Sequence, residues 1–158
     1  MIAVKHIEDT YRAIKYIELN LKSPLSVGSV ADYTGYSLYY FSRLFNKTTG
    51  HSPYDYIMRR RLSEAALELL YSGKRIIDIA FEYQFNNPET FSRAFNKMFN
   101  HLPSSIKTKN DLNKLILKVP ITKEYLKYIN NTAFSIKTDM IEKNIMYFIG
   151  FITDKINN

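Results

Sequence analysis

The 158-residue sequence contains no cysteine and no tryptophan, and it has only five glycines, five prolines and three histidines. The lack of cysteine excludes disulfide bonds, thiolate metal ligands and cysteine nucleophiles. No H-x3-H, D-x-D, P-loop or nucleophile-elbow pattern is present either. The sequence therefore predicts a protein that is not an enzyme and that uses no metal and no cofactor.

Long apolar runs are also missing. No run approaches the roughly 18 residues of a membrane span, and the opening residues MIAVKHIEDTYRAIKYIE lack the basic-then-apolar order of a signal peptide. We therefore expect a cytoplasmic protein with no membrane partner. Apolar residues make up 46% of the chain, which is enough for one domain or for two small ones sharing a core.

The net charge is +7, which favours a polyanionic partner, although weakly. The chain is also rich in Lys, Asn, Ile and Tyr, whose codons are AT-rich, so genomic composition is an alternative source of the excess. Charge alone leaves both explanations open.

A duplication is the most informative feature. The motif FSRLFNK at 41–47 returns as FSRAFNK at 91–97, and each copy is followed at the same offsets by a histidine and a proline. The apolar period is helical through most of the first 109 residues, and the stripe from Tyr11 to Leu21 places Glu18 on the polar side. A short helix, a tight turn and a second helix, written twice, predict two helix-turn-helix units.

Capping residues mark where the helices begin and end. They predict a first unit over about 26–50, a linker helix over about 53–71 and a second unit over about 75–100. A 19-residue linker spans about 28 Å, close to the ~34 Å between successive major grooves on one side of DNA. The capping residues are Ser26, Ser37, Ser52 and Asn87 before helices, Gly35 in the first turn and Gly50 after a helix.

The second helix of each unit has two different sides. An aromatic stripe at helical spacing is typical of core, and these stripes are Phe41, Leu44, Phe45 and Thr48 in one copy and Phe91, Ala94, Phe95 and Met98 in the other. The opposite, candidate DNA-binding faces are Tyr39, Ser42, Arg43, Asn46 and Lys47, then Glu89, Thr90, Ser92, Arg93, Asn96 and Lys97.

These opposite faces suit DNA recognition. Arginine pairs bidentately with guanine, Glu89 can accept from cytosine N4, and Tyr39 can pack against a thymine methyl. Lysines near the helix C-termini favour phosphate contact. Plain solvation is the alternative for any single residue, but it is weaker for Arg43 and Arg93 because the same residue occupies the same place in both copies.

The motifs A-x3-G-Y, F-x-R-x-F, K-x2-G-x-SP and a second F-x-R-x-F with a closing proline resemble the DNA-binding domain of AraC/XylS-type transcriptional regulators. The resemblance covers about residues 4–108. It implies a mainly α, seven-helix domain over 1–109 that binds double-stranded DNA as a monomer in two adjacent major grooves and activates transcription through RNA polymerase. It places base contacts at Tyr39, Ser42, Arg43, Pro88, Glu89, Thr90, Ser92 and Arg93.

The second unit departs from that pattern. Gln84 stands at the turn position where glycine is expected, Asn100 replaces the helix-closing glycine, and Leu102 replaces the serine that caps the last helix. A positive φ at Gln84 costs roughly 1 kcal/mol, and Leu102 cannot cap. These changes predict that the second unit is the weaker reader.

Residues 110–158 lose the helical period. KLILKVPI and NIMYFIGFIT have strand-like length and composition, and YLKYINN fits helix or strand. The resemblance implies a small α/β or hairpin extension, similar to the start of an effector-binding domain, which would bind a small molecule only if completed elsewhere. A rival function remains: a regulator that contacts RNA polymerase or another regulator and binds DNA weakly.

Overall fold

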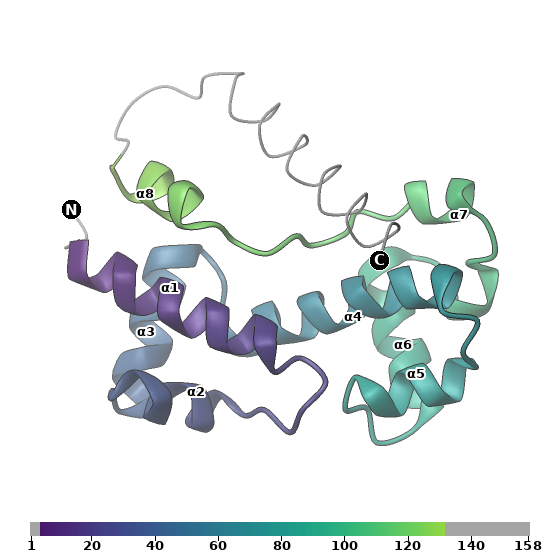
Figure 1. Ribbon diagram of the computed structural model, residues 1–158, viewed down its shortest axis with the longest axis horizontal. Coiled ribbons are helices and arrows are strands. Elements are labelled where there is room, and N and C mark those ends of the chain that lie inside the picture. The colour runs from purple at the N-terminus through teal and green to yellow at the C-terminus, as the bar shows by residue number, and fades with distance from the viewer. Residues whose placement is uncertain (1–3, 132–158) are drawn as a thin grey trace.

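The computed structural model describes residues 4–131, and in that part every regular element is helical. Helix α4 crosses the molecule, with α1, α2 and α3 at one end and α5 and α6 at the other (Figure 1). The mainly α prediction is confirmed. The elements are α1 (Val4–Leu19), α2 (Val27–Thr34), α3 (Leu38–Thr49), α4 (Pro53–Tyr71), α5 (Ile76–Glu82), α6 (Pro88–Phe99), the 3-10 helix η1 (Pro103–Ser105), α7 (Lys109–Asn113) and α8 (Lys123–Asn131).

The helices begin at the capping residues that the sequence indicated. Ser26 Oγ accepts from Ser29 N at 3.0 Å, Ser52 Oγ accepts from Asp55 N at 3.1 Å, and Asn87 Oδ1 accepts from Thr90 N at 2.7 Å. Each bond satisfies a helix N–H that has no partner within the helix. The two helix-turn-helix units therefore start where their local sequences place them.

Gly50 ends α3 in the left-handed region, at φ 75°. A Cβ built at this position would meet no atom within 4 Å, so a side chain there costs only backbone strain. We expect Gly50→Ala to lower the free energy of unfolding by about 1–2 kcal/mol, measured by chemical denaturation. Asn100→Gly at the repeat-equivalent position, φ 56°, is the control and should not destabilise the protein. An unchanged Gly50→Ala protein would contradict this explanation.

The second unit shows the departures expected from its sequence. Gln84 holds φ at 67° and Asn100 holds φ at 56°, so both adopt the conformation that glycine favours. Leu102 provides no side-chain cap, and the last helix of the unit is a single 3-10 turn over Pro103–Ser105. The missing cap expected at Leu102 is confirmed.

One core runs through both units. Phe41 and Phe45 of α3 and Phe91 and Phe95 of α6 are buried, so the aromatic stripes are core as predicted. Tyr56 of α4 packs against Phe45, with ring centroids 5.7 Å apart. The opposite sides of α3 and α6 are therefore turned outward.

One sequence expectation about a charged residue is wrong, and two arginines of α4 are buried. Arg60 is only 2% exposed, and it hydrogen-bonds Glu18 of α1 and Glu64 of α4. Glu18, expected on the solvent side of α1, is half-buried by this contact. Arg61 is also buried, and its guanidinium donates to the carbonyl oxygens of Leu21 and Ser23. Tertiary contacts thus draw Glu18 into a partly buried site, although the helical period alone assigns it to the surface.

The strand expected at KLILKVPI is also wrong. Residues 114–122 form no strand: Lys114 and Leu115 turn after α7, residues 116–122 have no regular secondary structure, and YLKYINN is helical within α8. Side chains of α4 satisfy the backbone of this segment: Ser63 Oγ accepts from Lys118 N at 2.8 Å, and Tyr56 Oη accepts from Ile121 N at 3.2 Å. The segment therefore lies along α4 (Figure 1). The second predicted strand, NIMYFIGFIT, lies outside the described residues.

No helix in residues 4–131 combines the length and the apolarity that crossing a membrane requires.

Candidate nucleic-acid interface

Helices α3 and α6 are built as a repeated pair at opposite ends of α4 (Figure 1). Each has 12 residues, begins at a polar N-cap and ends in a left-handed residue. The closing bond is the same in both: the N–H of Gly50 donates to Asn46 O, and that of Asn100 donates to Asn96 O, each at 2.8 Å. The repeat in sequence is therefore a repeat in backbone geometry.

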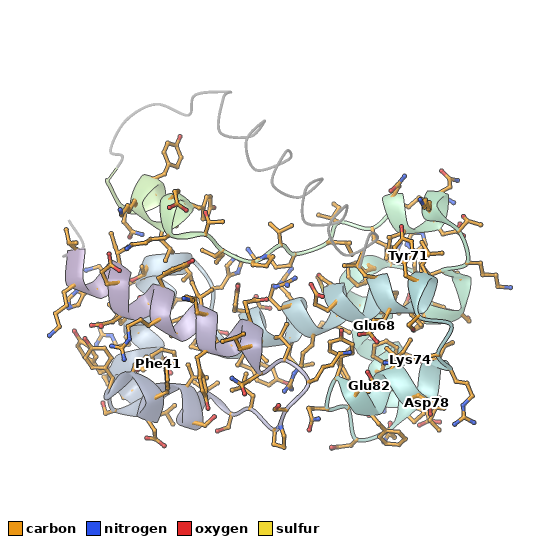
Figure 2. The ribbon with its side chains drawn as sticks, viewed as in Figure 1. Phe41, Glu68, Tyr71, Lys74, Asp78 and Glu82 are labelled. Carbon is orange, nitrogen blue, oxygen red and sulfur yellow. The ribbon has the colours of Figure 1, made fainter. Side chains whose placement is uncertain are left out.

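The outward faces repeat as well. The Phe41 side chain of α3 points into the core of the first unit, away from the polar face of the helix (Figure 2). The polar side chains above the two cores match in exposure, since the serines are half-buried and the others are exposed. Two firmly packed helices thus present similar polar faces. The exposed residues are Tyr39, Arg43, Asn46 and Lys47 on α3 and Glu89, Thr90, Arg93, Asn96 and Lys97 on α6; Ser42 and Ser92 are the half-buried pair.

The first face contains a pair that sequence reasoning did not find. Arg43 NH1 donates to Tyr39 Oη at 3.0 Å, and the guanidinium carbon lies 5.6 Å from the Tyr39 ring centroid. A guanidinium held over a ring is attracted to the π face and keeps other N–H groups for a ligand. Tyr39 therefore orients the Arg43 side chain on the surface of α3. The i, i+4 spacing of the two residues was the available signal.

The second face lacks this arrangement. Glu89 occupies the position of Tyr39, four residues before Arg93, and these two exposed side chains, both within the described residues, form no ion pair. Arg93 is therefore less ordered by its own helix than Arg43. This asymmetry agrees with the weaker second reader expected from the sequence, which stays a prediction.

The repeated histidines have structural contacts. His51 Nδ1 lies 3.4 Å from Asp55, and its Nε2 lies 2.9 Å from Lys118 Nζ. Burial and then the charge of Lys118 lower the pKa of His51. His101 Nδ1 lies 2.8 Å from the carbonyl oxygen of Phe99. Among residues 4–131, no group of three or more histidine and acidic side chains is placed to hold a metal ion.

Comparison with known proteins agrees with this geometry. A sequence profile described as a helix-turn-helix domain matches residues 30–109. Multiple antibiotic resistance protein MarA of Salmonella typhimurium is 37% identical over 97 residues, which are 61% of this chain and 76% of MarA. The chain belongs to the AraC/XylS family of DNA-binding transcriptional regulators.

Other members of the AraC/XylS family are similar over the same part. Transcriptional regulator Rob of Salmonella typhimurium is 36% identical over 106 residues, 67% of this chain, but only 37% of Rob is covered. The chain thus spans about a third of the length of such relatives. An AraC-type transcriptional regulator from Chromobacterium violaceum superposes with a TM-score of 0.61 at 28% identity, covering 66% of this chain and 94% of that one. The DNA-binding domain of AdpA, solved with a target DNA, shares the fold at a TM-score of 0.59 and 20% identity, covering 61% and 87%.

Proposed function

We propose that this AraC/XylS family member regulates transcription in the cytoplasm by placing α3 and α6 in adjacent major grooves of one operator. The matched exposure of the two polar faces at the ends of α4 carries the proposal. Arg43 and Arg93 read bases, and Lys47 and Lys97, in the last turns of their helices, contact phosphates.

Activation through RNA polymerase is part of the proposal and rests on the family alone. A specific observation also keeps the rival function in view: the α6 face has an acidic residue at Glu89 and no ordered arginine. If the second unit does not bind DNA, contact with RNA polymerase or another regulator becomes the main role. Binding of a small-molecule effector would need residues beyond those described.

Fluorescence anisotropy with mixed-sequence duplexes tests the proposal without a known operator. A duplex of about 20 base pairs holds two successive major grooves, whereas one of about 10 holds only one. We expect the longer duplex to bind at least about tenfold more tightly, and its affinity to fall steeply between about 50 and 200 mM salt. Equal affinity for both duplex lengths would contradict the two-groove arrangement. Affinity that does not depend on salt would favour the rival function, contact with RNA polymerase or another regulator.

A further inference from the structure

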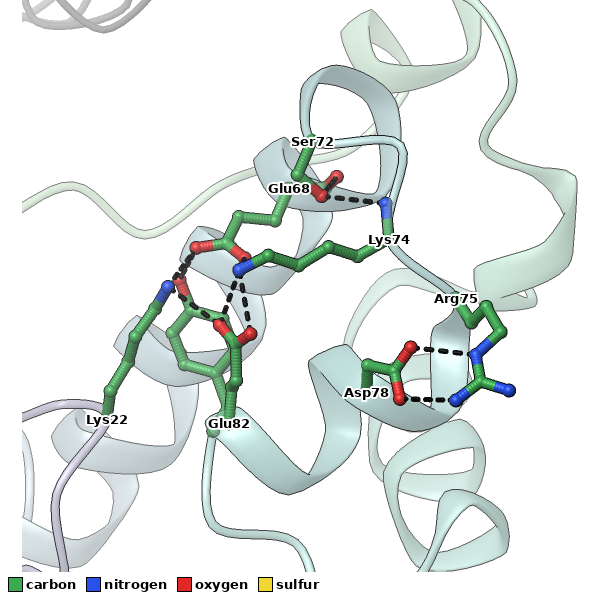
Figure 3. A network of polar contacts seen from close by, with 8 residues as sticks. Lys22, Glu68, Ser72, Lys74, Arg75, Asp78 and Glu82 are labelled. Carbon is green, nitrogen blue, oxygen red and sulfur yellow. Dashed lines mark hydrogen bonds and ion pairs between the residues drawn. The ribbon is translucent and has the colours of Figure 1, made fainter.

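Four opposite charges alternate where the end of α4 meets α5. Lys22 Nζ contacts Glu68 Oε1 and lies 3.0 Å from Glu82 Oε2. Lys74 Nζ lies 2.7 Å from Glu82 Oε1 and 3.4 Å from Glu68 Oε2. Figure 3 shows both carboxylates between both ammonium groups. Each charge therefore has two partners of opposite sign, which makes a small network and not an isolated surface pair.

The network joins parts of the chain that are far apart in sequence. Lys22 follows α1 and belongs to the first lobe (α1–α3), Glu68 lies in α4, and Glu82 lies in α5 of the second lobe (α5 and α6). Gln84 adds a further link, because its Nε2 donates to Lys22 O at 2.7 Å. We name Lys22, Glu68, Lys74, Glu82 and Gln84 the interlobe clasp.

In the part of the chain that the structure describes, the interlobe clasp is the polar link made directly between the two lobes. Within residues 4–105, the hydrogen bonds and ion pairs shown directly between the first and second lobes all involve Lys22. Its ammonium group also lies 5.1 Å from the ring centroid of Tyr83. Helix α4 connects the lobes at one end of each, so a contact away from that axis resists rotation of one lobe against the other.

The contacts of the clasp favour the charged forms of Lys22, Lys74 and Glu82, because they raise the pKa of both lysines and lower that of Glu82. Hydrogen bonds from Lys74 and then Lys22 lower the pKa of Glu82. Partial burial disfavours the charged form of Lys22, but the hydrogen bonds to Glu68 and Glu82 outweigh it and raise the pKa of Lys22. The clasp also explains why glutamine occupies position 84. The backbone there, at φ 67°, suits glycine, but glycine has no side chain that could donate a hydrogen bond to Lys22 O.

We propose that the interlobe clasp fixes the orientation of the second lobe relative to the first and so sets the base-pair spacing at which α3 and α6 read DNA together. The orientation follows from contacts within the protein, whereas the consequence for DNA rests on the proposed function. Glu82 and Gln84 are thus positioning residues for recognition helices that they do not belong to.

Three variants separate the clasp from its surroundings. Glu82→Gln removes the carboxylate that bridges the lobes, and Gln84→Gly removes the amide link without changing charge. Asp78→Asn is the matched control: it also removes one negative charge from α5, but Asp78 pairs only locally with Arg75, at 2.8 and 2.9 Å. Glu82→Gln and Asp78→Asn therefore change the net charge of the protein, and with it the general attraction to DNA, by the same amount.

The first experiment needs no DNA. Because the chain has no cysteine, Lys47→Cys and Lys97→Cys accept spin labels at repeat-equivalent positions of α3 and α6. Pulsed electron paramagnetic resonance should give one narrow distance distribution for the parent and for Asp78→Asn, and a broader one for Glu82→Gln and for Gln84→Gly. Circular dichroism checks that all variants are folded. Equally narrow distributions in every folded variant would overturn the proposal.

The second experiment measures spacing on DNA with unlabelled proteins. Inserting one base pair between the half-sites moves the second by about 3.4 Å and rotates it by about 35°. We expect the insertion to weaken wild type and Asp78→Asn at least about tenfold, and Glu82→Gln less than about threefold. An equal loss in all three contradicts the role in spacing. If wild type and control already lack two-part binding, the proposed function fails while the distance result still decides the clasp.

Discussion

Arg60→Met should lower the free energy of unfolding by about 3–5 kcal/mol, the largest effect on stability that we expect from a single substitution. The Arg60 guanidinium is 2% exposed and lies 2.8 Å from Glu18 Oε2, 2.7 Å from Glu64 Oε1 and 2.5 Å from Lys118 O. Methionine fills a similar volume but leaves both carboxylates without this cation. The loss should appear in urea or guanidinium denaturation at neutral pH.

Arg59→Met is the matched control for this substitution. Arg59 precedes Arg60 on α4 but is exposed, and its Nε pairs with Asp55 at 2.8 Å on the surface. Surface pairs contribute about 0–1 kcal/mol, so Arg59→Met should unfold almost as wild type does. If Arg60→Met and Arg59→Met have similar stabilities, the buried network does not hold α1, α4 and the 114–122 segment together as described.

Arg43→Ala and Arg93→Ala should each weaken binding to the specific two-part site by about 1–3 kcal/mol, or about 5- to 150-fold. Each arginine is exposed on the outward face of a helix whose other side is buried core. The loss should be larger for Arg43, because Tyr39 already orients its guanidinium. Anisotropy titrations at fixed salt on specific and on scrambled duplexes measure both effects.

Lysines at the ends of the same helices provide the comparison. Lys47→Ala and Lys97→Ala should weaken specific and scrambled duplexes alike and should lower the salt slope by about one each. Arginine variants that behave in this uniform way would be phosphate contacts, and base reading by the two helices would then be wrong.

The part of the fold that local sequence determines was predictable. Capping at Ser26, Ser52 and Asn87 and the closing glycine at Gly50 depend on residues within one turn of the helix end, so helix boundaries followed from sequence. The aromatic stripes at helical spacing indicated which sides of α3 and α6 are core. The candidate DNA-binding residues were therefore located on the outward faces before their contacts were known.

Contacts between distant segments were not predictable. Glu18 and Arg60 are 42 residues apart and Lys22 and Glu82 are 60 apart, so the local pattern around one residue does not indicate its partner. The segment 114–122 has the composition of a strand, but Ser63 and Tyr56 bond its backbone in place of a neighbouring strand. The domain boundary at residue 109 and the DNA-binding roles of the named residues stay predictions.

Selection of bound duplexes from a random-sequence library, with wild type beside Arg43→Ala and Arg93→Ala, tests the two-groove proposal most directly. We predict a two-part motif with centres about ten base pairs apart, in which Arg43→Ala degrades one half and Arg93→Ala degrades the other. A single half-site that is indifferent to Arg93→Ala, or no enriched motif, would contradict reading by both helices.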